Sequence, residues 1–348
     1  MTFRKPTTIH AGFNLLACLA GISACAFTRN LFSQGCIPAH YMSLSVGARG
    51  ISYLEPGQWE GDVSYRYLHA ETVFTGTEEQ PQLHEVGGRN TIHSIDLTAT
   101  YAIDYRFSLS LTLPFEHDDY SLPNGDGQRH GGTSAGPGDI RLLANAWILN
   151  PPDHPNGNIN FSLGVKFPSG DYNVMGEYHA ADGTVSSRPV DIAAQLGDGG
   201  WGIFLQTQGY QKLAKNFFGY MAGFYLLNPR DVNGTERALP LPGVNSVPDQ
   251  YLGRAGFSYT VWPSGGLALS LGGRIDGIPV HDLIGDSDGF RRAGYAVYID
   301  PGINWASGKN AFSVNVPVAV ERNLEQSALS STGSFADFIV VASYSYRF

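Results

Sequence analysis

The chain has 348 residues and a formal net charge of −9, with 15% charged residues, 12% aromatic residues and 43 glycines. This charge content is low for a soluble protein, and the acidic balance argues against a nucleic-acid partner. The sequence contains no run of about 18 apolar residues, so a transmembrane helix is not expected. Many glycines and tyrosines with modest charge instead predict a chain with two faces, one in contact with water and one in an apolar environment.

Residues 1–26 have the features of a secretory signal peptide. Arg4 and Lys5 give a positively charged start, an apolar stretch spans 13–24, and Ala24-Cys25-Ala26 matches the small-x-small cleavage pattern. The mature chain is therefore predicted to begin after residue 26 and to be exported. Residues 27–57 are irregular and are predicted to form a periplasmic lead-in or an inner plug.

The three cysteines all lie near the start of the chain. Cys18 and Cys25 fall within the predicted signal peptide, so Cys36 is the one thiol expected in the mature chain and no internal disulfide is predicted. An alternative is lipoprotein cleavage, which places a lipid on Cys25. Because no CxxC or Cys/His metal spacing occurs, the sequence predicts neither a metal site nor a cofactor.

From Trp59 onward, apolar and polar residues alternate with the period of two expected of strands that have one apolar face. The clearest case runs from Phe107 to Phe115, where the apolar residues alternate with Ser108, Ser110 and Thr112. The pattern predicts strands at Trp59–His69, Thr91–Ile103, Arg106–Glu116, Gly138–Leu149, Asn158–Phe167, Trp201–Tyr210, Asn216–Leu227, Gln250–Trp262, Leu267–Asp276, Ala293–Trp305, Ala311–Glu321 and Phe335–Phe348.

These predicted strands are even in number, and long connections alternate with short ones. Outer-membrane barrels have short periplasmic turns and long extracellular loops, and lipid offers no hydrogen bonds to an open strand edge. The predicted fold is therefore all-β: a closed antiparallel up-and-down transmembrane β-barrel of 12 strands over residues 58–348.

Proline and tryptophan positions add two further expectations. Proline cannot complete a ladder hydrogen bond, so Pro301 and Pro317 are expected at strand ends or bulges. Tryptophans near strand ends suit aromatic girdles at the membrane interfaces, and those positions are Trp59, Trp201, Trp262 and Trp305. Trp147 points inward by the same alternation.

The last predicted strand, 335–348, ends in a free carboxylate beside a phenylalanine. Tyr344, Tyr346 and Phe348 occupy alternate positions there. This ending resembles the terminal strand of Gram-negative outer-membrane β-barrels, in which these positions mark the chain for assembly. The resemblance implies localisation in the bacterial outer membrane, with outer-membrane lipid and the barrel assembly machinery as partners.

Three stretches resemble the outer-membrane transporter family named for the MetA pathway of phenol degradation. They are Gly-Pro-Gly-Asp-Ile-Arg at 136–141, Leu-Gly-Val-Lys-Phe-Pro-Ser-Gly-Asp at 163–171, and the segment 272–291. The resemblance implies a barrel that lets small molecules, hydrophobic or aromatic ones among them, cross the outer membrane. It identifies neither the solute nor a binding residue.

Twelve charged residues face the lumen by alternation with the apolar positions: Glu60, Asp62, Arg66, Asp96, Arg141, Lys166, Arg254, Arg274, Asp276, Glu321, Asp337 and Arg347. They either form a polar path that selects a solute or pair with one another and fill the interior. About eight strands make a barrel just filled by side chains and sixteen make an open pore, so twelve allow both. A narrow or largely filled lumen is the favoured expectation.

Two loop motifs suggest other chemistry. His117 precedes two aspartates, as an acid-paired histidine that activates water would, but no nucleophile is placed beside it by sequence. The segments 124–127 and 286–289 resemble pieces of calcium loops but lack the spaced ligands and final glutamate, so turns are expected there.

The sequence therefore predicts an outer-membrane barrel, not an enzyme, that passes or binds a small molecule. One alternative is a structural or surface-interaction barrel with a closed lumen that acts through its loops. The other is a barrel lipid hydrolase. The solute is not identified by any motif.

Overall fold

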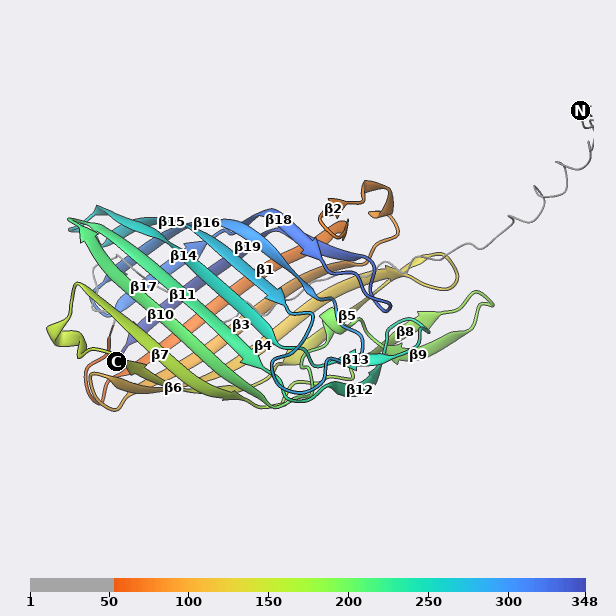
Figure 1. Ribbon diagram of the computed structural model, residues 1–348, viewed down its shortest axis with the longest axis horizontal. Helices are drawn as coiled ribbons and strands as arrows, with labels where there is room; N and C mark the ends of the chain where they lie inside the picture. Colours follow the sequence, from red (N-terminus) through yellow and green to blue (C-terminus); the bar gives the residue numbers. More distant parts are fainter. Residues whose placement is uncertain (1–52) are drawn as a thin grey trace, which may run out of the picture.

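The computed structural model describes residues 53–348, so the predicted signal peptide and most of the segment 27–57 lie outside the described residues. The described chain forms a closed antiparallel β-barrel of 12 strands, which lies on its side in Figure 1. The barrel closes where β19 (Gly333–Arg347) pairs with β1 (Trp59–Thr75), from Glu60 opposite Arg347 to Phe74 opposite Gly333. The predicted fold class is confirmed.

Ten of the barrel strands are single elements, and the other two are each split into two elements, β5 with β6 and β17 with β18. The remaining barrel elements are β3 (Arg89–Ala102), β4 (Phe107–Pro123), β5 (Arg129–Pro137), β6 (Arg141–Trp147), β7 (Gly157–Lys166), β10 (Gly202–Ala214), β11 (Phe217–Leu227), β14 (Gln250–Trp262), β15 (Leu267–Ile278), β16 (Gly294–Ser307), β17 (Asn310–Asn315) and β18 (Val318–Leu324). The connections hold β2 (Glu78–Glu79), β8 (Met175–His179), β9 (Val185–Pro189), β12 (Val232–Glu236), β13 (Val244–Ser246), and the 3-10 helices η1 (Pro81–Leu83), η2 (Pro151–Asp153) and η3 (Ile192–Ala194).

The outer face of the wall is apolar. On β4, the side chains from Phe107 to Phe115 at odd positions are 38–46% exposed, whereas Thr112 between them is buried. Exposed apolar residues recur on each of the 12 strands. A continuous apolar belt of this kind is stable against lipid and unfavourable in water. Among residues 53–348, no helix is long and apolar enough to cross a membrane.

The two ends of the barrel differ, as Figure 1 shows. One end, here called the turn end, carries the C-terminus and short connections such as Lys215-Asn216, where Asn216 adopts φ 61°, a conformation that asparagine tolerates. The other end, the loop end, carries the β8–β9 and β12–β13 hairpins. The alternation predicts a long loop at 117–136, between the strands Arg106–Glu116 and Gly138–Leu149. That prediction is wrong in part, because β4 and β5 continue pairing to Pro123 opposite Arg129.

Prolines within the wall sit opposite interruptions in the neighbouring strand. Pro317 lies in the gap between β17 and β18, and Pro301 faces that same gap, where its carbonyl accepts from Val316 N at 3.0 Å. Pro114 faces the gap between β5 and β6. A missing N–H costs little at a position where no partner strand continues. The expectation is met for Pro317, which lies between the ends of β17 and β18, whereas Pro301 lies within β16, opposite that break and not at a strand end or bulge.

Two predicted lumen residues lie elsewhere. Glu321 and Asp337 are exposed, because the pairing shifts register between Val297 and Tyr298 on one side and between Leu68 and Ala70 on the other. A bulge adds one residue and reverses the alternation beyond it. Outside the lumen, Asp337 Oδ1 accepts a hydrogen bond from Arg322 Nη2 at 2.6 Å.

Candidate channel interior

Inward side chains of the wall are charged or polar toward the middle of the barrel. Seven predicted lumen residues have buried side chains: Arg66, Asp96, Arg141, Lys166, Arg254, Arg274 and Asp276. Near the turn end, Glu60, Asp62 and Arg347 are half-buried, and Arg347 Nε donates to Glu60 Oε2 at 2.9 Å. That these residues line a path for a solute stays a prediction.

The buried charges are paired within the interior. Arg141 Nη2 donates to Asp96 Oδ2 at 2.7 Å, with both side chains at most 4% exposed. Arg254 Nη2 lies 3.0 Å from Asp300 Oδ2. Arg274 Nε lies 3.4 Å from its neighbour on the same face, Asp276 Oδ1. Pairing is what makes these charges tolerable, because an isolated buried charge costs several kcal/mol.

Side chains of like charge also lie opposite each other on adjacent strands. Arg141 is directly opposite Lys166 on β7, and Arg254 is directly opposite Arg274 on β15. Cross-strand pairs of one sign are destabilising unless counter-charges intervene. Here Lys166 pairs with Asp198 and lies 3.5 Å from Asp139 Oδ2. Each of these four cations therefore has an aspartate counter-charge.

A cavity of about 140 Å³ lies between this charged layer and the loops. Arg141, Lys166 and Leu226 line it from the wall, and Ile192 and Ala193 of η3 line it from the loop end. The loops therefore form a roof over the interior. An engineered apolar cavity of about 150 Å³ accepts benzene, so this volume suits a molecule of that size.

The roof is held by two arginine–aspartate pairs. Arg292 donates from Nη1 and Nη2 to the two carboxylate oxygens of Asp191, at 2.8 and 2.6 Å. Asp191 also caps η3 by accepting from Ala193 N at 3.0 Å. Arg291 makes the same two-fold contact with Asp282, at 2.7 Å for each bond. Such forked pairs fix geometry as well as charge, so the roof has a defined position.

Behind these pairs, Arg237 packs its guanidinium over the Phe290 ring, 3.9 Å from the centroid. Burial, together with the nearby Arg292 guanidinium, lowers the pKa of Arg237 to about 10. The residue nevertheless stays charged at neutral pH. Its Nη2 donates to Leu329 O at 3.0 Å, which ties the 325–332 loop to the roof.

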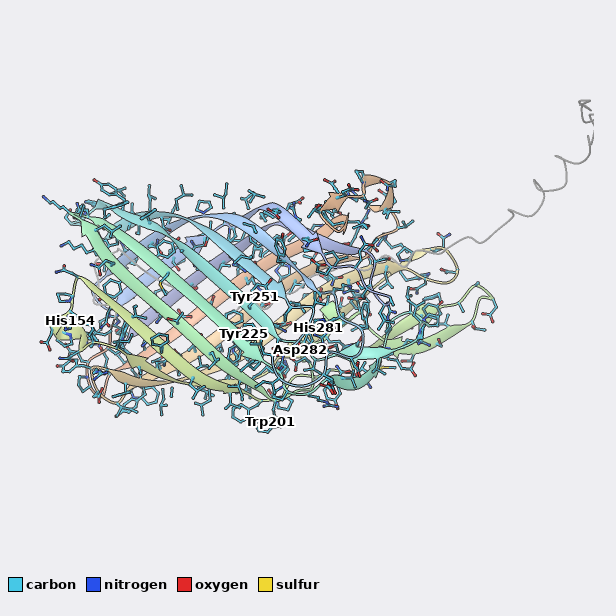
Figure 2. All side chains as sticks on the ribbon, in the orientation of Figure 1. His154, Trp201, Tyr225, Tyr251, His281 and Asp282 are labelled. Atoms are coloured by element: carbon cyan, nitrogen blue, oxygen red, sulfur yellow. The ribbon has the colours of Figure 1, made fainter. Side chains whose placement is uncertain are left out.

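The roof is also tied to the wall at the loop end. Asp249 Oδ2 accepts from Tyr225 Oη at 3.1 Å and from Leu283 N at 2.9 Å. Asp249 N donates to Asp282 Oδ1 at 2.9 Å. Figure 2 shows Tyr225, Tyr251 and Asp282 together at this part of the barrel. Asp282, which binds Arg291, is thereby held by Asp249, which immediately precedes β14 and is bonded to Tyr225 of β11.

Small polar side chains continue the interior toward the turn end. Asn145 Nδ2 donates to Ser110 Oγ at 2.9 Å, Ser162 Oγ donates to Asn145 Oδ1 at 2.6 Å, and Thr98 and Thr112 share a hydrogen bond of 2.9 Å. These side chains are short and polar. Hydroxyl and amide groups thus lie between the paired charges below the roof and the Glu60–Arg347 pair at the turn end.

Sequence reasoning missed several residues of this interior. Glu116 lines the cavity, and Asp118 and Asp300 are buried. Alternation along β4 and β16 was sufficient to identify all three. Asp139 and Asp198 fall outside strands, so no period of two marks them. Asp191 and Arg292 are 101 residues apart in the chain, and no local pattern links them.

The predicted assembly residues lie at the turn end. Tyr344 and Phe348 are exposed and Tyr346 is half-buried. Phe348 N donates to Trp59 O at 2.8 Å, so the chain end is joined to β1. Their part in assembly stays a prediction.

The tryptophans predicted near strand ends are exposed: Trp59, Trp201, Trp262 and Trp305. Trp147 is buried, as expected from its alternation.

His117 lies on the outer face of the wall. Its side chain is 51% exposed, and its Nε2 is 3.6 Å from Asp119 Oδ2. His117 shares the face of β4 that carries Phe115, whereas Glu116 on the other face lines the cavity. The hydrolase alternative therefore places its histidine outside the enclosed interior.

No family model and no curated protein matches the sequence. Solved structures do match the fold. The COG4313 outer membrane channel from Pseudomonas putida F1 is 17% identical with a TM-score of 0.60, covering 88% of this chain and 100% of that chain. The Ralstonia pickettii toluene transporter TbuX is 11% identical with a TM-score of 0.46, covering 92% and 96%. The beta domain of the Bordetella autotransporter BrkA is 13% identical with a TM-score of 0.46, covering 84% and 100%. The first likeness shows that the chain has the barrel fold found in that outer-membrane channel.

Proposed function

We propose that this protein is an outer-membrane channel for small molecules, with the loop end outside the cell and the turn end in the periplasm. The observation that carries the proposal is the 140 Å³ cavity under the roof, enclosed by a barrel with an apolar outer belt. Long loops face outward and short turns face the periplasm in barrels of this kind. The fold shared with the Pseudomonas putida channel supports the same reading.

The cavity lining suggests the class of solute. Pro114, Ile192 and Leu226 offer apolar surface, and the charged groups beside them are paired with counter-charges. A strongly charged solute would compete with those pairs, whereas a neutral molecule would not. We therefore infer a benzene-sized, neutral solute that carries a hydrogen-bonding group, of which phenol is the simplest example.

Uptake into proteoliposomes tests this function. Phenol crosses lipid unaided, so the transported probe is arabinose, a small neutral sugar, followed by liposome swelling, with phenol added as a competitor. Wild-type protein is expected to increase arabinose entry over protein-free liposomes, and phenol is expected to slow that entry. Ala193→Phe fills the cavity under the roof and is expected to return entry to near the protein-free rate.

Ala328→Phe is the matched control, because Ala328 is exposed in the 325–332 loop and does not line the cavity. It is expected to leave arabinose entry unchanged. Entry by wild-type protein equal to that of protein-free liposomes would contradict the proposal and favour a closed barrel that acts through its loops. Equal entry through both phenylalanine variants would place the path elsewhere.

A further inference from the structure

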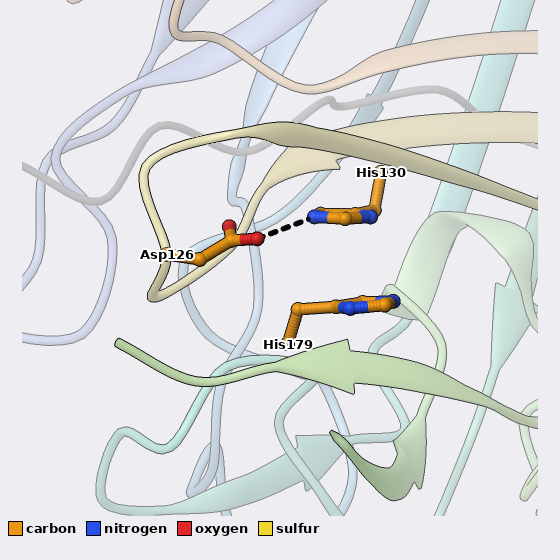
Figure 3. A group of neighbouring side chains, drawn as sticks. All are labelled: Asp126, His130 and His179. Atoms are coloured by element: carbon orange, nitrogen blue, oxygen red, sulfur yellow. Dashed lines mark hydrogen bonds and ion pairs between the residues drawn. The ribbon is translucent and has the colours of Figure 1, made fainter. Parts of the chain in front are cut away.

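Two hairpins of the loop end bring a carboxylate and two imidazoles together. Asp126 lies in the turn between β4 and β5, His130 follows on β5, and His179 ends β8. Their ligand atoms all lie within 4.8 Å of one another. Figure 3 shows the two rings one above the other with the carboxylate beside them. Spacing along the sequence predicted no metal site, because His179 comes from a separate hairpin.

The backbone holds this cluster in place. Asp126 N donates to His179 O at 3.3 Å, which joins the two hairpins directly. A Cβ at Gly125 would lie 2.5 Å from Tyr178 Oη and 3.2 Å from Ala181 N, so glycine gives the room for this close approach. Backbone contacts therefore bring the two turns together independently of the three side chains.

The side chains are arranged as potential ligands. His130 Nε2 lies 2.8 Å from Asp126 Oδ2, and the rings of His130 and His179 stack with centroids 3.7 Å apart at 6°. The Gln128 backbone N–H and the His130 side chain lower the pKa of Asp126, which keeps the carboxylate charged. Each of the three is partly exposed, so an ion can enter from water.

We propose that Asp126, His130 and His179 bind a divalent transition metal of the zinc class. Imidazole nitrogen and carboxylate oxygen suit Zn²⁺, with bonds of about 2.0–2.2 Å that set ligand atoms about 3.3 Å apart. The ligand atoms already lie within 4.8 Å of one another, and the stacked rings rotate so that both nitrogens point at the ion. Three protein ligands leave one tetrahedral position for water. Glu177 Oε2, 3.6 Å from His179 Nε2, adds a second carboxylate at the rim.

The bound ion links the β4–β5 hairpin to the β8–β9 hairpin. From β9 the chain runs on to Asp191 and η3, which roof the cavity. Metal binding therefore stiffens the segment that carries the roof. This consequence is independent of which solute the barrel passes, and the metal site itself does not depend on a transport function.

Zinc titration of the untagged full chain, refolded in detergent micelles, tests the site. Isothermal calorimetry with ZnCl₂ is expected to show a site that is weakened at least about 100-fold by His179→Ala or by Asp126→Ala, since even groups that only support ligands contribute about 10–100-fold. Co²⁺ is expected to give the intense absorption of a tetrahedral site in wild type and to lose it in both variants. Retention of the barrel on unheated SDS gels checks folding.

His154→Ala is the matched control, because His154 lies at the opposite end of the barrel, as Figure 2 shows. Its zinc affinity is expected to equal that of wild type. Zinc is also expected to slow hydrogen exchange of both hairpins in wild type and in His154→Ala. If zinc fails to bind, or binds His179→Ala as tightly as wild type, or leaves exchange of both hairpins unchanged, the proposal is overturned.

Discussion

The buried pair of Asp96 and Arg141 gives the sharpest test of how the interior is held together. Asp96→Asn removes the negative charge from a contact of 2.7 Å in which Arg141 is 2% exposed. Removing one partner of a buried ion pair costs about 3–5 kcal/mol. Arg141 also feels the charge of Glu116, so we expect the lower end, about 3 kcal/mol, or roughly a 100-fold shift in the folding equilibrium.

Urea unfolding of protein refolded into lipid vesicles, followed by tryptophan fluorescence, measures that change. The double variant Asp96→Leu with Arg141→Met replaces the pair with apolar side chains. It is expected to lie within about 1 kcal/mol of wild type, because paired buried charges contribute little net stability. If Asp96→Asn unfolds within about 0.5 kcal/mol of wild type, the interior charges are hydrated and the paired, narrow lumen is wrong.

Three further changes probe the wall, the chain end and the roof. Leu111→Arg places a charge in the middle of the apolar belt and is expected to cost about 2–4 kcal/mol in vesicle unfolding; no change would mean that this face does not meet lipid. Deletion of Phe348, 67% exposed, is expected to shift unfolding by under about 0.5 kcal/mol yet to lower the amount of folded protein in outer-membrane fractions; equal amounts would contradict an assembly signal. Arg292→Met releases Asp191 and the roof, and is expected to increase conductance in planar bilayers; unchanged conductance would show that the roof does not limit passage.

The strands were predictable because lipid and lumen impose one period along the whole wall. The predicted strand Gln250–Trp262 has the bounds found in the structure; β7 differs from its prediction by one residue at each end, and β11 by one residue at its start. Outside the membrane this constraint ends, so the continuation of β4 to Pro123 was not predicted. The β8–β9 and β12–β13 hairpins carry no alternation that distinguishes them from loops.

The interior was predictable only where alternation is unbroken. Asp96 and Arg141 follow it, and their pairing is an outcome of strand order. Glu321 and Asp337 do not follow it, because a single extra residue at a bulge reverses which face a side chain takes. The roof and the Asp126 cluster depend on contacts between loops, which the sequence does not encode by any local period.

Fluorophore labelling of successive positions along β4 tests the central claim, which is that the wall has lipid on one face and a polar interior on the other. In a background in which Cys18, Cys25 and Cys36 are replaced by serine, single cysteines at 109, 110, 111 and 112 carry a fluorophore in refolded vesicles. Positions 109 and 111 are expected to be quenched by brominated lipid, and positions 110 and 112 are expected to be insensitive to it. Equal quenching at all four positions, or quenching at the even positions alone, would contradict the barrel described here.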